Sequence, residues 1–254
     1  MEDQERLNNI FFGLIGKNIS YSFSKTYFSK KFKNLQLSNS EYLNFDLKRI
    51  EDFSAIIHKF KGSLRGLNVT IPYKLSIFNY VDHVDETAKK VGAINTIKFA
   101  NNGSLIGYNT DVFGFENSLT PILKKHHNKA LILGTGGASK AVSYVFEKLN
   151  IEYFKVSRNP KDPLQISYED ITNDLLNKYT IIVNCSPVGT FPNINDKPNI
   201  PYHFLTDKHL LYDLIYNPTE TAFLKEGKKQ LTQIKNGYEM LELQAEESWR
   251  IWNN

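Results

Sequence analysis

The sequence predicts an α/β protein with two domains, because an alternation of apolar strands and helical segments occurs twice along the chain. The first series begins near residue 10, and the second opens with the apolar run Ala130–Leu133. Such alternation favours layered α/β folds over helical bundles and β-sandwiches. A length of 254 residues with 41% hydrophobic residues is enough for two modest cores. We place the domain boundary near residue 113, where the pattern restarts.

The first series contains strand-like and helix-like segments in turn. The segments are 11–15, 25–35, 42–45, 50–60 and 64–69. A hairpin follows, because Asn101-Asn102-Gly103 separates the strand-like runs 96–99 and 104–108. Asn-Gly is a strong hairpin signal, since both residues tolerate positive φ. The hairpin is expected to bring together two Asn-Thr pairs, Asn95-Thr96 and Asn109-Thr110.

The second series starts with a strand, a glycine-rich turn and an amphipathic helix. Apolar residues recur at helical spacing from Ala138 to Leu149, and the turn before them reads Leu-Gly-Thr-Gly-Gly, residues 133–137. Glycines at this place allow backbone N–H groups to approach a pyrophosphate, whose charge the helix N-terminus favours. The turn predicts a dinucleotide site, although a glycine-rich turn without a ligand remains the alternative. Further strands are expected at 153–157, 180–184 and 210–216.

The tip of the second strand in this series indicates which dinucleotide is bound. It reads Val-Ser-Arg-Asn-Pro-Lys-Asp, residues 156–162, with Arg158 and Lys161 and no acidic residue before them. An Arg at this position suits a 2′-phosphate, whereas an acid suits a ribose 2′-hydroxyl. The tip therefore favours NADP(H). Asp162 beside a ribose hydroxyl, or a solvated Arg158, is the alternative.

Polar residues at the end of the strand 64–69 and after the hairpin are candidates for the chemistry. Asn68, Thr70 and Lys74 are expected at a strand end and the start of a helix, and Asp111 follows the second Asn-Thr pair. Ligands of open α/β sheets bind at strand carboxyl ends. A Lys and an Asp at close range can move a proton to or from an alcohol or ketone oxygen. Taken singly, Lys74 could be a solvated side chain, Asn68 and Thr70 turn caps, and Asp111 a helix cap.

Composition excludes several other classes. The net charge of +4 comes from scattered lysines, which does not indicate nucleic-acid binding and would suit a small anionic substrate. The one cysteine, Cys185, leaves no intrachain disulfide or cysteine-rich metal site. The apolar stretch 10–15 is too short to span a membrane. We expect a cytoplasmic protein with no membrane, nucleic-acid or metal partner.

Six sequence blocks carry a resemblance to a known family. They are Asn68-Val-Thr-Ile-Pro-Tyr-Lys74, Gly92-Ala-Ile-Asn-Thr96, Gly107-Tyr-Asn-Thr-Asp-Val-Phe-Gly114, Asn184-Cys-Ser-Pro-Val-Gly189, Asp213-Leu-Ile-Tyr-Asn-Pro218, and Gly237-Tyr-Glu-Met-Leu241 with Gln244-Ala245. In this order and over nearly the whole chain, the sequence resembles the shikimate dehydrogenase family. The resemblance implies reversible NADPH-dependent reduction of 3-dehydroshikimate to shikimate, a step of aromatic amino-acid biosynthesis.

The resemblance also implies an architecture. It places an N-terminal α/β substrate domain at 1–112, a Rossmann-like NADP-binding domain at 113–236, and a C-terminal helix that returns to the substrate domain at 237–254. A monomer or homodimer is expected.

Site residues follow from the same blocks. The resemblance implies Lys74 and Asp111 as the catalytic pair. It implies as substrate-binding residues Ser22, Ser24, Thr70, Asn95, Asp111, Tyr216 and Gln244. It implies as cofactor-binding residues Gly134, Thr135, Gly136, Gly137, Ala138, Ser157, Arg158, Asn184, Ser186, Gly237 and Met240. No metal is implied.

The early serine block departs from the family pattern. Ser22 and Ser24 keep the carboxylate-binding serines, but Tyr21 replaces a His, and Asn18 and Lys25 replace two prolines. Without the prolines the turn is less pre-set. Two other functions stay open: a quinate/shikimate dehydrogenase that accepts NAD, and a non-catalytic NADP(H)-binding sensor on the same fold. The joint presence of Lys74, Asp111, Asn95 and Gln244 argues against the sensor.

Overall fold

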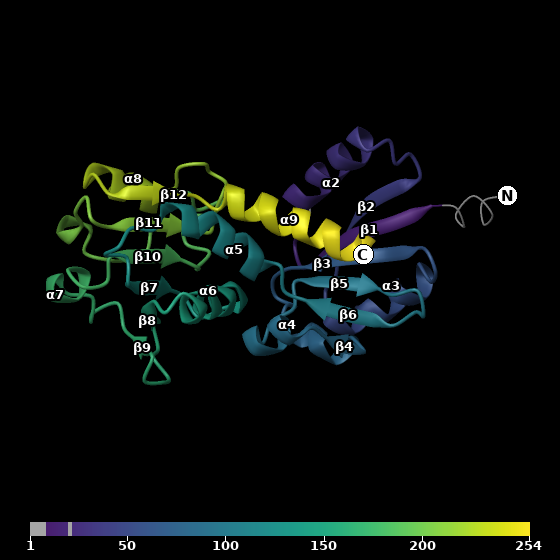
Figure 1. Ribbon diagram of the computed structural model, residues 1–254, viewed down its shortest axis with the longest axis horizontal. Helices are drawn as coiled ribbons and strands as arrows, with labels where there is room; N and C mark the ends of the chain where they lie inside the picture. The colour runs from purple at the N-terminus through teal and green to yellow at the C-terminus, as the bar shows by residue number, and fades with distance from the viewer. Residues whose placement is uncertain (1–8, 20–21) are drawn as a thin grey trace. The chain divides into compact units, whose positions relative to one another are not determined.

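A computed structural model describes residues 9–19 and 22–254 of the chain (Figure 1). The chain divides into two compact units. The N-terminal unit contains the described residues up to Thr110 together with Ala245–Asn254, and the central unit is Asp111–Gln244. The α/β class predicted from the alternating pattern is confirmed.

A mixed sheet of six strands forms the N-terminal unit. Its order is β2-β1-β3-β5-β6-β4. Three strands are parallel neighbours, β2 (Ser40–Asp46), β1 (Ile10–Gly16) and β3 (Leu64–Val69). The hairpin strands β5 (Thr96–Phe99) and β6 (Leu105–Tyr108) then run antiparallel to each other, and the short β4 (His83–Val84) closes the edge.

Helices cover both faces of this sheet because side chains of β1 alternate between two cores. Phe11 and Ile15 belong to the core with α3 (Phe53–Lys59). Phe12 and Leu14 belong to the other core, with α2 (Phe23–Asn34) and the end of the last helix. The helix α4 (Glu86–Val91) leads into the hairpin.

The last helix, α9 (Tyr238–Asn253), contributes residues to both units. Its final turns pack on the N-terminal unit, where the Trp252 indole donates to the carbonyl of Ile97 at 3.0 Å. Gly66 lies under this indole, and a Cβ there would overlap the ring. The close approach explains why the β3 strand carries a glycine at this position.

The central unit holds a fully parallel sheet in the order β12-β11-β10-β7-β8-β9. Its strands are β7 (Lys129–Leu133), β8 (Glu152–Val156), β9 (Gln165–Ile166), β10 (Ile181–Asn184), β11 (Leu210–Asp213) and β12 (Gln233–Lys235). Its helices are α5 (Asp111–Leu119), α6 (Gly137–Lys148), α7 (Asn173–Leu176) and α8 (Ala222–Lys229), besides the start of α9. The first strand of the unit, β7, is central, and the order reverses between β7 and β10. This is the order of a doubly wound nucleotide-binding sheet, whose ligands bind at the reversal.

The core of the central unit could be recognised in the sequence from its apolar strands. In the central unit β7 is apolar after Lys129 and β10 is apolar up to Asn184, and Leu131, Leu133 and Ile182 on these strands are fully buried. Continuous apolar runs are expected for parallel strands covered on both sides.

Candidate active site

The two Asn-Thr pairs of the N-terminal unit interlock at the open end of the hairpin. Asn95 Nδ2 donates to Thr110 Oγ1 at 3.0 Å, and the Thr110 backbone N–H donates to Asn95 Oδ1 at 2.7 Å. Asn109 Nδ2 donates to the carbonyl of Ala93 at 2.9 Å. The pairing Thr96↔Tyr108 sets this arrangement, so the hairpin prediction is confirmed. Asn95 is only 2% exposed, so its amide is held in one orientation.

Lys74 and Thr70 lie at the same end of the sheet as Asn95. The Thr70 N–H donates to the carbonyl of Ile15 at 2.8 Å, and the Lys74 carbonyl accepts from Ile94 N–H at 2.9 Å. Both loops are thus tied to the strand ends. Lys74 is half-buried.

The expected helix start at Lys74 is wrong. Strand β3 ends at Val69, a series of turns follows, and the short 3-10 helix Ser76–Tyr80 begins only after Lys74. A proline disfavours the helical conformation for the residue before it, here Ile71, and the Tyr73 N–H donates to the Thr70 carbonyl at 2.9 Å within a turn. Lys74 is therefore carried by a turn that is held through its own carbonyl.

The predicted carboxylate-binding serines lie at the start of α2. Ser22 is the N-cap of this helix, and its Oγ accepts from Lys25 N–H at 3.3 Å. Ser24 follows in the first turn and hydrogen-bonds the side chain of Tyr42. Tyr21 lies outside the described residues. A Ser cap makes up for the prolines that this turn lacks, because it fixes the start of the helix.

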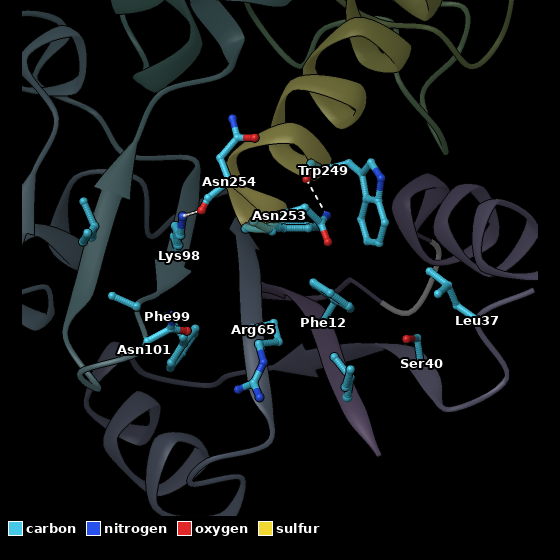
Figure 2. A pocket seen from close by; sticks show the side chains of 14 residues that line it. Phe12, Leu37, Ser40, Arg65, Lys98, Phe99, Asn101, Trp249, Asn253 and Asn254 are labelled. Atoms are coloured by element: carbon cyan, nitrogen blue, oxygen red, sulfur yellow. Dashed lines mark hydrogen bonds between the residues drawn. The ribbon is translucent and has the colours of Figure 1, made fainter. Parts of the chain in front are cut away.

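The N-terminal unit also has a hollow of about 530 Å³, at the opposite end of its sheet. It lies at the beginnings of β1 and β3 and contains none of the predicted site residues. Figure 2 shows two hydrogen bonds at its rim, from Lys98 Nζ to the Asn254 carbonyl and from Asn253 Nδ2 to the Trp249 carbonyl, at 2.8 and 2.7 Å. Since ligands of α/β sheets bind at strand carboxyl ends, we do not assign the catalytic site to this hollow.

Asp111, Met240 and Gln244 lie in the central unit, on α5 and the start of α9. Asp111 is the first residue of α5 and is 2% exposed. The two helices approach closely at Gly114, where a Cβ would lie 2.5 Å from the Met240 carbonyl oxygen and 3.2 Å from Gln244 Cβ. Lys74 belongs to the other unit, so its pairing with Asp111 remains a prediction.

The glycine-rich turn lies at the reversal point of the parallel sheet. Gly134 has φ +112°, and a Cβ there would lie 3.3 Å from the backbone nitrogen of Ser186, which follows the neighbouring strand β10. At Gly136, the N-cap of α6, a Cβ would meet open space, and within the described residues no side chain caps the helix. Thr135 is exposed, and Gly137 and Ala138 begin the helix. The backbone N–H groups of this end suit a pyrophosphate, so the residues fit a dinucleotide.

Arg158 lies exposed just after β8. Its neighbour Ser157 accepts from Asn159 N–H through Oγ at 3.2 Å, which shapes the tip of the strand. Asp162 is held within its own turn, since its carboxylate accepts from Leu164 N–H at 3.0 Å and from the Gln165 amide. This favours Arg158 over Asp162 as the group that meets the ribose substituent.

Asn184 and Ser186 form part of a buried polar cluster behind the turn. Asn184 is fully buried and its Oδ1 accepts from the backbone N–H and the Oγ of Ser186, at 3.1 and 2.6 Å. Its Nδ2 donates to Asp213 at 3.0 Å. Asn184 therefore holds the loop that follows β10, and its contact with a cofactor remains a prediction.

Asp213 is a functional candidate that the sequence analysis did not assign. It is fully buried and accepts from Thr221 Oγ1 at 2.6 Å and Ile215 N–H at 3.0 Å, as well as from Asn184. Burial, the largest influence, raises the pKa of Asp213 to about 6. Its position in the block Asp213–Pro218 was the only signal that could have identified it.

Tyr216 and Gly237 lie beyond β11 and β12. Tyr216 is half-buried, and burial raises the pKa of its hydroxyl. Gly237 N–H donates to the Ile215 carbonyl at 3.1 Å, and a Cβ at Gly237 would overlap the Leu214 backbone. Gly237 thus lets the start of α9 approach the loop that carries Tyr216.

Residues 9–19 and 22–254 contain neither a candidate metal site nor a candidate membrane span. Among these residues, no group of three or more His, Cys, Asp or Glu side chains is placed to hold a metal ion. No helix in the described part of the chain is long and apolar enough to cross a membrane.

The central unit is a doubly wound sheet with a glycine turn at its reversal point, and the N-terminal unit carries polar residues at the carboxyl ends of its strands. These features are typical of dinucleotide-dependent proteins. Residues 14–97 match the family model of the shikimate dehydrogenase substrate-binding domain. The chain is 37% identical to shikimate dehydrogenase (NADP⁺) of Methanococcus vannielii, over 96% of this chain and 91% of that protein.

Solved structures agree with this match. A shikimate dehydrogenase of Aquifex aeolicus has a TM-score of 0.86 at 31% identity, covering 96% of this chain and 92% of that one. The Thermus thermophilus enzyme, solved with NADP(H) and shikimate, has a TM-score of 0.84 at 26% identity, covering 96% and 93%. The protein belongs to the shikimate dehydrogenase family.

Proposed function

We propose that this protein is an NADP-dependent oxidoreductase that catalyses the reversible conversion of shikimate and 3-dehydroshikimate. The observation that carries the proposal is a group of polar residues at the carboxyl end of strand β3 in the N-terminal unit. Lys74, Thr70 and the hydrogen-bonded amide of Asn95 occur together there. Its relatives are named for this reaction with NADP⁺.

Substrate binding is assigned to neutral hydrogen-bonding groups. The hydroxyls of Ser22 and Ser24 receive the carboxylate of shikimate, and Asn95 with Gln244 receives ring hydroxyls. Thr70 and Tyr216 line the pocket. Directional amide and hydroxyl groups suit such a ring, because each hydroxyl both donates and accepts hydrogen bonds.

Proton transfer is assigned to Lys74. In the oxidation of shikimate, the hydroxyl proton passes to Lys74, while the ring carbon loses a hydride and becomes a ketone. In the reduction, Lys74 returns the proton to the oxygen. Asp111 is assigned to orient the reacting oxygen and Lys74. Acid/base groups of this kind contribute rate factors of about 10²–10⁴.

NADP(H) supplies the hydride acceptor or donor of the reaction when it is bound. The backbone of Gly134–Ala138 would hold its pyrophosphate, and Arg158 beside Ser157 would hold the 2′-phosphate. Ser186, positioned by Asn184, and Gly237 with Met240 would face the remainder of the cofactor. We assign Asn184 to positioning because its side chain hydrogen-bonds Val188, Asp213 and Ser186.

The wider setting is inferred from chemistry. The protein is proposed to act in the cytoplasm as a monomer or homodimer, with small-molecule partners only. The nearest alternative function is a quinate/shikimate dehydrogenase that accepts NAD. The exposed Arg158 favours NADP(H), because a guanidinium can bind the 2′-phosphate through two hydrogen bonds.

The test is the reduction of NADP⁺ or NAD⁺ by the purified protein, with shikimate or quinate as the second substrate. We expect rapid reduction with shikimate and NADP⁺, and much slower reduction in the other three combinations. Comparable rates with NAD⁺ or quinate would contradict the specificity. No reduction in any combination, together with binding of NADP(H), would favour the sensor.

A further inference from the structure

A chain of hydrogen bonds in the N-terminal unit begins at one proposed substrate-binding group, Ser24. Ser24 hydrogen-bonds the side chain of Tyr42, and the Tyr42 hydroxyl donates to Asn68 Oδ1 at 2.8 Å. Asn68 Nδ2 then donates to Ser248 Oγ at 2.9 Å. Tyr42, Asn68 and Ser248 come from β2, β3 and α9, so the chain crosses the sheet and reaches the last helix.

The chain continues from Ser248 to a second proposed substrate-binding group, Asn95. Ser248 Oγ lies 2.9 Å from Thr96 Oγ1 and 3.2 Å from Thr110 Oγ1. Thr110 Oγ1 accepts from Asn95 Nδ2 at 3.0 Å. An unbroken series of side-chain hydrogen bonds therefore joins Ser24 to Asn95.

Burial makes this chain sensitive to the loss of one hydroxyl. Ser248 and Thr96 are 0% exposed, and Tyr42 is 1% exposed. Water cannot replace a missing partner at such positions, so the neighbouring groups must shift or remain unpaired. The Tyr42 ring stacks on Phe28 with centroids 4.7 Å apart, so its hydroxyl is held in one place. Burial raises the pKa of this hydroxyl, which keeps it a donor.

All members of the chain are neutral amides and hydroxyls. Each can accept one hydrogen bond while it donates another, so the orientation of one group fixes that of the next. The two ends come from separate elements, Ser24 from α2 and Asn95 from the loop before β5. A rigid ring needs binding groups at a fixed separation, and groups ordered beforehand bind it at a lower entropic cost.

We propose that Tyr42, Asn68 and Ser248 are positioning residues that fix the separation of Ser24 and Asn95, and thereby determine affinity for a rigid ring that carries both a carboxylate and hydroxyls. The proposal deepens the proposed function and rests on it.

The first test uses two tyrosines in matched settings. Tyr42→Phe removes one hydroxyl from the chain but keeps the stacked ring. Tyr212→Phe is the control, because Tyr212 is also fully buried and its hydroxyl lies 2.7 Å from a serine, Ser118, in the central unit. We expect Tyr42→Phe to raise the KM for shikimate about tenfold, the effect of one lost hydrogen bond, and to leave the KM for NADP⁺ unchanged. Tyr212→Phe should change neither KM.

The serines provide a second matched pair. Ser248→Ala should raise the KM for shikimate in the same way, whereas Ser118→Ala should not. Both variants lower thermal stability, because each breaks a buried hydrogen bond. We therefore expect each variant and its control to differ in the KM for shikimate and not in the melting temperature. A merely structural role would not produce this difference in KM.

A double variant tests the direction of coupling. If Tyr42 acts through Ser24, adding Tyr42→Phe to Ser24→Ala should raise the KM no further than Ser24→Ala alone. Multiplicative effects, or an unchanged KM in both Tyr42→Phe and Ser248→Ala with an active wild type, would overturn this inference and leave the proposed function intact. A wild-type protein inactive on shikimate would overturn both.

Discussion

Each unit has one proposed ligand-binding edge, which is the end of its sheet where the carboxyl ends of the strands and the loops after them lie. The two edges are built in different ways. In the N-terminal unit, polar side chains interlock with one another, as Asn95 does with Thr110. In the central unit, the groups proposed to bind the cofactor are a backbone turn at Gly134 and the exposed Arg158. A ring of hydroxyls requires directional side chains in fixed positions, whereas phosphates are bound well by backbone N–H groups and a cation. The construction of each edge thus suits the chemistry of the ligand proposed for it.

The supporting clusters differ too. Neutral amides and hydroxyls support the N-terminal edge, among them Asn68 and Ser248. A buried carboxylate, Asp213, supports the central edge through Asn184 and Thr221. Substitutions at the two edges should therefore have different effects. Those in the N-terminal unit should lower turnover of shikimate or affinity for it. Those in the central unit should lower affinity for NADP⁺ or change the pH dependence of stability.

The largest effect is expected at Lys74. Lys74→Ala should lower kcat for shikimate oxidation by about 10²–10⁴-fold, the range for a lost acid/base group. The fold should persist, since the bond from Ile94 N–H goes to the Lys74 backbone carbonyl. Steady-state kinetics measure the change, with Lys90→Ala, an exposed lysine of α4, as the control. Near-normal turnover would remove Lys74 from the mechanism.

The next effect concerns the pH dependence of stability through Asp213. Its pKa is raised from 3.8 to about 6, so the folded chain holds a proton more tightly than the unfolded chain. Stability from this group is complete below pH ~4 and is lost as the pH rises through about 6, by roughly 3 kcal/mol. Asp213→Asn should remove this loss.

Urea unfolding of wild type and Asp213→Asn at pH 4 and pH 7 measures the difference. Other titrating groups contribute equally to both proteins and cancel. We expect the free energy of unfolding to fall more in wild type between the two pH values. An equal fall in both proteins would show that Asp213 does not titrate in this window.

Cofactor choice should respond to Arg158. Arg158→Ala removes the proposed partner of the 2′-phosphate and should raise the KM for NADP⁺ by about 10- to 100-fold, as expected for charge-assisted hydrogen bonds. The KM for NAD⁺ should stay within about twofold. Arg158→Lys keeps the charge without the planar fork and should fall between. Equal losses for both cofactors would contradict the assignment.

The smallest effects should separate the two serines. Ser24→Ala is expected to raise the KM for shikimate about tenfold and to lower stability less than Ser22→Ala does, because the Tyr42 hydroxyl still donates to Asn68. Ser22→Ala should raise the KM and also lower the free energy of unfolding by ~1 kcal/mol, because Ser22 caps α2. Thermal melts and kinetics on both variants test this, and identical behaviour of the two would contradict the separate roles.

The fold could be predicted from the sequence because its signals are local. The apolar run at Ala130–Leu133, the glycine turn after it and the Asn-Gly hairpin each occupy a short window. The helix expected at Lys74 was wrong because the order of polar and apolar residues there does not distinguish a helix from successive turns. Pro72 was the signal that favoured a turn at this place, because a proline disfavours the helical conformation for the residue before it.

The supporting clusters could not be predicted from the sequence, since their partners are far apart along the chain. Ser248 bonds Thr96 across 152 positions, and Asn68 bonds Ser248 across 180. No spacing rule connects such residues. Asp213 and Asn184 lie 29 positions apart on neighbouring parallel strands, and only the sheet order brings them together.

The central claim is that shikimate binds at the edge of the N-terminal unit and NADP⁺ at the edge of the central unit. The most direct test is a crystal structure of the protein with both ligands. We expect the shikimate carboxylate within about 3.2 Å of the Ser22 and Ser24 hydroxyls, and the 2′-phosphate within the same distance of the Arg158 guanidinium. A carboxylate bound away from both serines, or a 2′-phosphate without contact to Arg158, would contradict the assignment of the two edges.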